Sequence, residues 1–246
     1  MKFSDPNWGC TGRPKYVVVK VDFDADDINA AQAIADSKMH YINIHSPGGV
    51  KRSPEIIRNR IIAGKLADAA VFQLIQRAIR KYKLSSRYTV HEYDSDRTDG
   101  FQHPDPYDLT LETASGIEEI EVRSSFSYRL GKPNKIIQKM SIYGWYVSAN
   151  KPAETPRDWY WQVMYHLRPK DLAREDNWPD VAVFENQLDV NEVAGYIVGG
   201  SSREALQHNG SIRSDQDGAL YQAITPICGG MDAWEMISTM LDIPKP

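Results

Sequence analysis

Hydrophobic positions recur along the chain in patterns that predict several helices. The longest pattern covers residues 53–82, where apolar side chains return every four or five positions behind a serine and a proline typical of a helix N-terminus. An acidic start followed by alanine-rich sequence predicts a helix within residues 26–37. Shorter helices are expected at residues 201–210 and 232–243.

Strand-like segments fill most of the remaining sequence. They are rich in β-branched and aromatic residues and are separated by Gly, Pro and Asp turns. We expect strands within residues 15–23, 40–50, 87–94, 107–113, 117–129, 141–148, 158–167, 181–185 and 193–200. This mixture predicts an α/β or α+β fold in which helices flank one mixed sheet. Residues 1–50 are a candidate N-terminal appendage to a main domain of residues 51–246.

The segment at residues 107–129 predicts a hairpin with an unusual concentration of charge. Successive side chains of a strand point to opposite faces, so Ile120 and Val122 are expected to face the core. Glu121 and Arg123 then lie on the reverse face. An acidic hairpin is usually a solvated sheet face, which remains the alternative interpretation.

Pairing across the short Ala-Ser-Gly turn is expected to bring Asp108 close to Glu121. Two converging carboxylates repel each other unless a cation lies between them, and oxygen ligands favour magnesium or manganese over zinc or copper. A cationic neighbour such as Arg123 could balance charge at a phosphate or orient a water molecule. The hairpin therefore predicts a metal site.

These residues resemble the PD-(D/E)xK nuclease superfamily, which includes restriction endonucleases. The matching positions are Asp108 in DPYDLTL, and Glu121 and Arg123 in IEVR. Members of the superfamily commonly carry an acidic residue on a preceding helix, and AGKLADAAV offers Asp68 there. The resemblance covers roughly residues 55–200 and implies a restriction-endonuclease-like core sheet flanked by helices.

The resemblance also implies an activity, namely hydrolysis of DNA by a magnesium-dependent endonuclease. Asp108 and Glu121 would hold Mg²⁺ or Mn²⁺, with Asp68 as an outer-shell or second-metal carboxylate and Arg123 at the scissile phosphate. The expected substrate is double-stranded DNA. Symmetric cleavage of a duplex needs two such centres, so we expect a homodimer.

The chain departs from the superfamily at Arg123, which stands where lysine is usual. Arginine keeps the positive charge but stays protonated and is bulkier. Three hypotheses follow: a working variant, a site that borrows Lys135, Lys139 or Lys151, and a catalytically inactive DNA-binding relative. A structural or interaction protein with an acidic surface hairpin is a further alternative.

Charge and hydropathy bear on which partners the chain could contact and on its location in the cell. The net charge is −4, and basic residues cluster within residues 51–65 and 77–87, as phosphate contacts or as a solvated helix face. No apolar stretch is long enough to span a membrane, and the N-terminus lacks the apolar core of a signal peptide. We expect a cytoplasmic protein without membrane contact.

Two further acidic segments have simple structural interpretations. Residues 22–27 are expected to be the acidic start of a helix, and residues 94–100 a turn rather than a calcium loop. The aromatic residues within 141–148 and 158–167 are expected to be core more than base-stacking groups.

Overall fold

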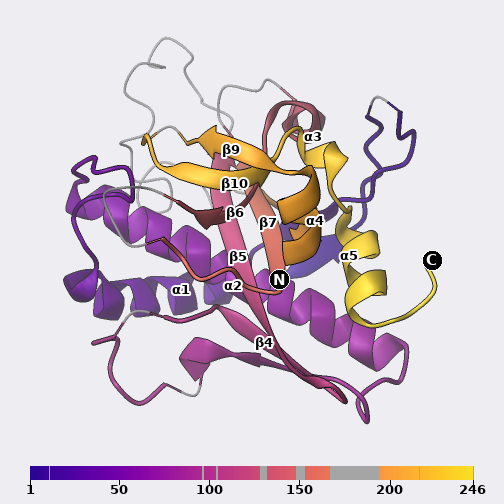
Figure 1. Cartoon of the computed structure of the whole chain (residues 1–246). Helices are drawn as coiled ribbons and strands as arrows, with labels where there is room; N and C mark the ends of the chain where they lie inside the picture. The colour runs from indigo at the N-terminus through magenta and orange to yellow at the C-terminus, as the bar shows by residue number, and fades with distance from the viewer. Residues whose placement is uncertain are drawn as a thin grey trace.

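The computed structural model describes residues 1–10, 12–95, 97–103, 105–127, 132–147, 153–166, 194–215 and 217–245. This part of the chain is a mixed α/β fold, which confirms the predicted fold class (Figure 1). Its helices are α1 (Ala25–Lys38), α2 (Pro54–Lys81), α3 (Ile136–Lys139), α4 (Arg203–Asn209) and α5 (Ala233–Met240).

The described strands form a seven-stranded and a three-stranded sheet. They are β1 (Lys2–Ser4), β2 (Val19–Asp22), β3 (Thr89–Glu92), β4 (Leu109–Thr113), β5 (Gly116–Ser127), β6 (Ile142–Tyr146), β7 (Trp159–His166), β8 (Ala194–Ser202), β9 (Ser211–Ser214) and β10 (Leu220–Ile224). The large sheet has the order β1-β2-β8-β7-β5-β4-β3, and the small one β6-β10-β9. Strands β5 and β7 are parallel, whereas all other neighbours are antiparallel.

Each face of the large sheet has its own hydrophobic core. One core contains Ile120 and Val122 of β5, together with apolar residues of α1, α2 and α5. The other joins β7 and β8 to α3, α4 and the small sheet, and includes Tyr160. Trp161 and Tyr165 are also fully buried, as predicted for the aromatic residues of this segment, whereas Trp159 is half-buried. The alternation of strand side chains divides the residues between the two cores.

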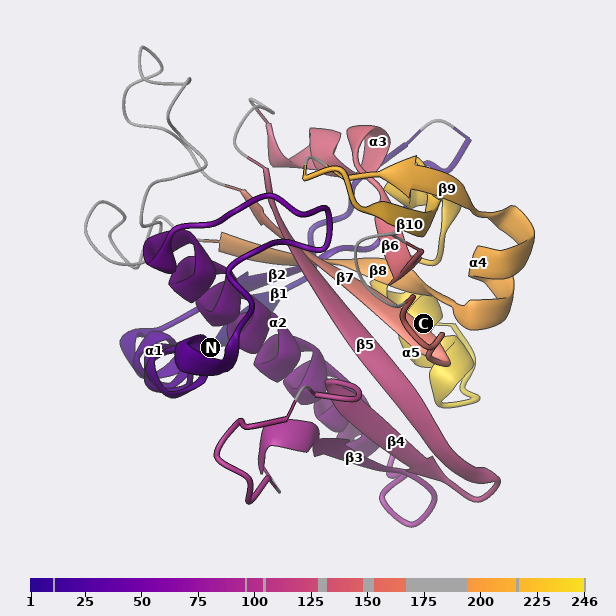
Figure 2. The ribbon, with the colours of Figure 1, turned by 60° about the vertical axis from the view of Figure 1, so that its left-hand side comes forward.

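Helix α2 contributes many of the apolar side chains of the first core. Its start is fixed by Ser53, whose hydroxyl accepts a hydrogen bond from the N–H of Ile56 (3.3 Å), and by Pro54 in the first turn. Its apolar face then packs against the sheet, and the hydroxyl of Tyr165 donates to the carbonyl of Ala63 (2.7 Å). Figure 2 shows α1 and α2 side by side, with the long strand β5 crossing the molecule beside them.

The N-terminal region belongs to this same sheet and core. Strand β2 pairs with β8, and Val21 and Ile28 lie in the core shared with α2. The boundary expected near residue 50 therefore marks no break in the sheet or the core.

The strand expected at residues 40–50 is wrong, because this segment closes on itself at a Pro-Gly-Gly turn, where the N–H of Ser46 donates to the carbonyl of Val50 (2.8 Å). The strand expected at residues 181–185 lies outside the described residues. Among the residues that the structure does describe, no helix has the length and apolar character required to cross a bilayer.

Candidate active site

Asp108 and Glu121 lie next to each other on the hairpin formed by β4 and β5. Leu109 pairs with Ile120, so the residue before β4 is brought to Glu121, and the N–H of Asp108 donates to the carbonyl of Ile120 (3.2 Å). The Oδ2 atom of Asp108 accepts a hydrogen bond from the N–H of Val122 (2.8 Å). The hairpin register thus places the backbones of the two residues side by side on adjacent strands, as the sequence predicts.

Helix α2 brings a third carboxylate, Asp68, to the same site. Asp68 is buried, and the charge of Asp108 is among the causes that raise its pKa. Asp68 and Asp108 likewise both act on the pKa of Glu121. The helix acid and the hairpin acids therefore form one electrostatic group.

The three carboxylates are poorly solvated and repel one another. Burial, reinforced by Asp108, raises the pKa of Asp68 to about 8. Burial also raises the pKa of Glu121 to about 8, against the opposing effect of Arg123. The pKa of Asp108 is raised by burial too, although Lys65 lowers it. A buried group of acids with raised pKa values is a common property of functional sites.

Lys65 is part of the site, although the sequence pattern had assigned it no role there. Its Nζ lies 2.7 Å from Oδ2 of Asp68 and 2.7 Å from Oδ2 of Asp94. Burial disfavours the ammonium, but Asp68, Asp108 and Asp94 raise the pKa of Lys65 well above its usual value. A lysine three positions before an acid on a predicted helix was the signal that could have revealed the pair.

Arg123 lies on the same face of β5 as Glu121 and is held there by two acids. Its Nη1 lies 3.1 Å from Oε1 of Glu121, and its Nη2 donates to Glu154 and to the carbonyl of Gly144 (3.2 Å). Burial opposes the charged guanidinium, but Glu121 and Glu154 outweigh this effect and raise the pKa of Arg123. The ring centroid of Tyr221 lies 5.8 Å from the guanidinium carbon. The guanidinium is therefore anchored by protein groups.

The lysines named as substitutes for Arg123 lie elsewhere or cannot be placed. Lys135 and Lys139 are exposed before and at the end of α3, and Lys151 lies outside the described residues. Lys65 is the lysine that the structure brings to the carboxylates.

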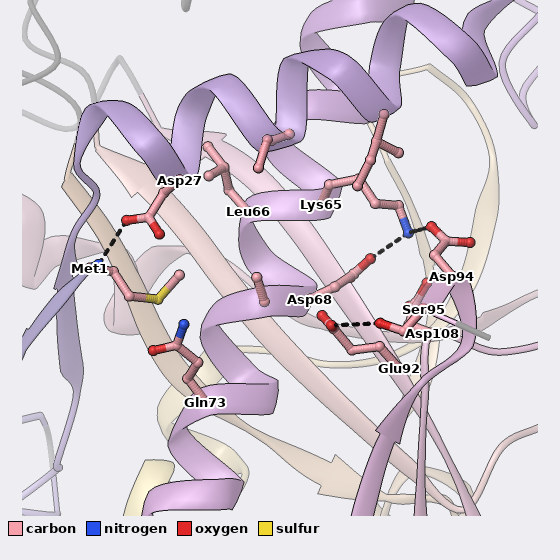
Figure 3. A pocket seen from close by; sticks show the side chains of 14 residues that line it. Met1, Asp27, Lys65, Leu66, Asp68, Gln73, Glu92, Asp94, Ser95 and Asp108 are labelled. Carbon is pink, nitrogen blue, oxygen red and sulfur yellow. Dashed lines mark hydrogen bonds and ion pairs between the residues drawn. The ribbon is translucent and has the colours of Figure 1, made fainter. Parts of the chain in front are cut away.

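A hollow of about 300 Å³ adjoins Asp68 and Asp108 between α1, α2 and the segment after β3 (Figure 3). Its charged lining consists of Asp27, Lys65, Asp68, Glu92, Asp94 and Asp108. Figure 3 shows Lys65 reaching from α2 to Asp68 and Asp94. Apolar side chains of α1 and α2 complete the lining, so the hollow offers a small ligand both charged and apolar contacts.

The donor set fits a hard divalent cation in its chemistry. Asp68, Asp108 and Glu121 offer only oxygen atoms, and a dication would relieve the repulsion that raises their pKa values. Within the described ranges, no group of three or more His, Cys, Asp or Glu side chains is arranged to hold a metal ion. Mg²⁺ commonly binds through one or two carboxylates, with water and phosphate oxygens completing its shell. The acids present match this type of site in the chemistry of their donor atoms.

The neighbouring acidic segments have structural roles. The carboxylate of Asp24 caps α1 by accepting from the N–H of Asp27 (3.0 Å), as the acidic helix start predicts. In residues 94–100 the side chain of Arg97 is only 2% exposed and pairs with Asp94, Asp99 and Asp105. The segment is thus organised around an internal guanidinium.

The basic cluster within residues 51–65 is largely paired inside the protein. Arg58 lies 2.6 Å from Asp36, and Arg60 lies 3.0 Å from Asp217. Arg77, in the second cluster, lies over the ring of Phe3. These contacts favour the structural interpretation for these three arginines.

Comparison with known proteins finds a distant relative of the chain. It is 25% identical over 240 residues to an uncharacterized protein of Methanocaldococcus jannaschii, an alignment that covers 92% of this chain and 86% of that protein. No described protein family matches the sequence. No solved structure matches it either.

Proposed function

We propose that the protein is a magnesium-dependent endonuclease of the restriction type that hydrolyses phosphodiester bonds in DNA. The observation that carries this proposal is that Asp68 of α2 and Asp108 of the hairpin line one hollow, with Glu121 on the strand next to Asp108. The resemblance of the hairpin residues to the PD-(D/E)xK superfamily supports it, because a helix acid and two hairpin acids are what that resemblance implies.

Each residue of the site would have its own role in phosphodiester hydrolysis. Asp108 and Glu121 would hold Mg²⁺, or Mn²⁺, and Asp68 would complete the acidic site from the helix. A bound dication supplies Lewis-acid stabilisation at the phosphate and a more acidic water molecule. Arg123 would hold the Glu121 carboxylate in place, since its Nη1 lies 3.1 Å from Oε1 of Glu121.

We further propose double-stranded DNA as the substrate and a homodimer as the working form. Each chain would carry one acidic site, and two sites related by a two-fold axis would cut the two strands of a duplex.

The test is digestion of a supercoiled plasmid of mixed sequence with the purified protein. We expect nicked or linear products with Mg²⁺ or Mn²⁺ and none with an excess of chelator. Thermal unfolding with and without the same ions gives a second measurement, because a ligand of the folded state raises its stability. If the protein shows no cleavage and no thermal shift with either ion, the proposal is contradicted.

A catalytically silent DNA-binding relative is the second candidate. The observation that favours it is the engagement of Arg123 by Glu121, Glu154 and the carbonyl of Gly144, because this anchors the group expected at the phosphate. Gel-shift and cleavage assays on one duplex separate the two candidates. The silent relative retards the duplex without cutting it at any divalent-ion concentration.

A further inference from the structure

The site contains a second cation besides Arg123, and it comes from helix α2. We propose that Lys65 is a positioning residue of the site, where it holds the Asp68 carboxylate toward Asp108 and supplies the lysine that β5 lacks. This inference rests on the proposed nuclease function. It differs from the three hypotheses that the sequence suggests, since none of them includes Lys65.

The contacts of Lys65 leave it with capacity for a ligand. Its ammonium carries three N–H donors, of which one makes the hydrogen bond to Asp68 (2.7 Å), while Asp94 lies 2.7 Å away as an ion-pair partner. The side chain is 13% exposed and lines the hollow of about 300 Å³ beside Asp108. A phosphate oxygen or a water molecule bound there would meet a donor that the hydrogen bond to Asp68 does not use.

Surrounding residues fix the ammonium in this position. Asp94 is held in turn by Arg97, whose Nη1 lies 3.2 Å from the Asp94 carboxylate and whose side chain is 2% exposed. The flexible lysine stem is thereby anchored at its tip as well as at the helix. A chain of contacts from Arg97 through Asp94 and Lys65 to Asp68 therefore sets the direction of the helix acid.

Charge balance gives Lys65 a measurable effect on cation binding. Its ammonium neutralises part of the field of Asp68, Asp108 and Asp94, so it competes with an incoming dication. Removing the ammonium should tighten Mn²⁺ binding by about tenfold, because like charges within a few ångströms repel strongly at low effective dielectric. The same removal should slow cleavage, because Asp68 and the bound phosphate lose a fixed donor.

The experiment compares Lys65→Met and Lys65→Arg with the wild-type protein. Mn²⁺ affinity is measured by isothermal titration calorimetry without DNA, and kcat and KM on a plasmid substrate. For Lys65→Met we expect tighter Mn²⁺ binding together with a kcat reduced about 100-fold, and for Lys65→Arg a partial recovery of kcat. Lys20→Met is the matched control, since Lys20 also pairs with an aspartate, Asp22 (2.6 Å), but on β2; it should behave as wild type.

A second variant guards against misfolding of Lys65→Met. The double variant Lys65→Met/Asp94→Asn removes both charges of the pair, and we expect it to fold and to show the same reduced kcat. A wild-type kcat in either Met variant, or weaker Mn²⁺ binding in both, overturns the role of Lys65. If the wild-type protein still cleaves DNA in that case, the proposed function stands. A wild-type protein that neither binds Mn²⁺ nor cuts DNA overturns the proposed function and this inference together.

Discussion

The Oδ2 atom of Asp108 accepts a hydrogen bond from the backbone N–H of Val122, 2.8 Å away on the neighbouring strand. Val122 stands between Glu121 and Arg123, so this bond ties the acid before β4 to the charged pair of β5. Backbone pairing thereby fixes the relative positions of the hairpin acids before any ligand binds. Groups held in this way need little reorganisation when a ligand binds. Such preorganised charge is what electrostatic catalysis requires.

Replacing Glu121 should separate catalysis from folding. We expect Glu121→Gln to lower plasmid cleavage by about 100-fold or more, because an amide is a poorer ligand than a carboxylate for a hard dication. Stability at pH 8 should not fall, since a repelled charge is removed. Glu119→Gln is the matched control on the same face, where Glu119 pairs with Arg157 (2.6 Å), and it should cleave as wild type. Equal activity of the two variants would remove Glu121 from the site.

Variants of Arg123 should change stability as well as activity. Arg123→Ala leaves Glu121 and Glu154 without their shared cation, so we expect a loss of about 3 kcal/mol in the free energy of unfolding, measured by denaturant titration. Arg123→Lys keeps the charge and should retain measurable cleavage and most of the stability, although the forked geometry is lost. Unchanged stability of the alanine variant would contradict the anchoring role of Arg123.

The raised pKa values predict how stability depends on pH. Asp68 and Glu121 lose their protons near pH 8 when folded, against ordinary values of 3.8 and 4.5. The folded protein thus binds more protons than the unfolded chain between these limits, and the free energy of unfolding falls as pH rises through this window. One unit of pKa difference corresponds to about 1.4 kcal/mol.

Equilibrium unfolding between about pH 5 and about pH 9 measures this dependence. We expect the wild-type protein to lose at least about 1.4 kcal/mol relative to the double variant Asp68→Asn/Glu121→Gln over this range. Parallel stability curves for the two proteins would show that these carboxylates titrate normally.

Two glycines should respond to alanine in opposite directions. Gly64 lies inside α2, and an added Cβ would have no atom of a described residue from outside the helix backbone within 4 Å. The glycine is therefore not needed for a close contact with another element. Gly64→Ala should therefore stabilise the protein by about 0.5–1 kcal/mol. Gly199 has φ of +99°, and a Cβ would lie 2.0 Å from the carbonyl oxygen of Met231. Gly199→Ala should cost about 2 kcal/mol or more. Thermal unfolding of the two variants checks both signs.

The sequence determined the local structure of this protein. Periodicity and a Ser-Pro start were enough to place α2, because helix formation and capping depend on neighbours in the sequence. Alternation placed Ile120 and Val122 in the core and left Glu121 and Arg123 on the reverse face of β5. The short turn was also enough to set Asp108 beside Glu121, since hairpin register follows from the turn.

Only the tertiary structure decided which distant residues complete the site. Lys65 and Asp94 are separated by a helix end, a strand and a turn, and Glu154 follows Arg123 after several further elements. Such contacts depend on how α2 packs on the sheet and how the small sheet covers the other face, which no local pattern specifies. Long-range packing also placed β1 and β2 in the main sheet, where β2 pairs with β8 and so leaves no open edge between them.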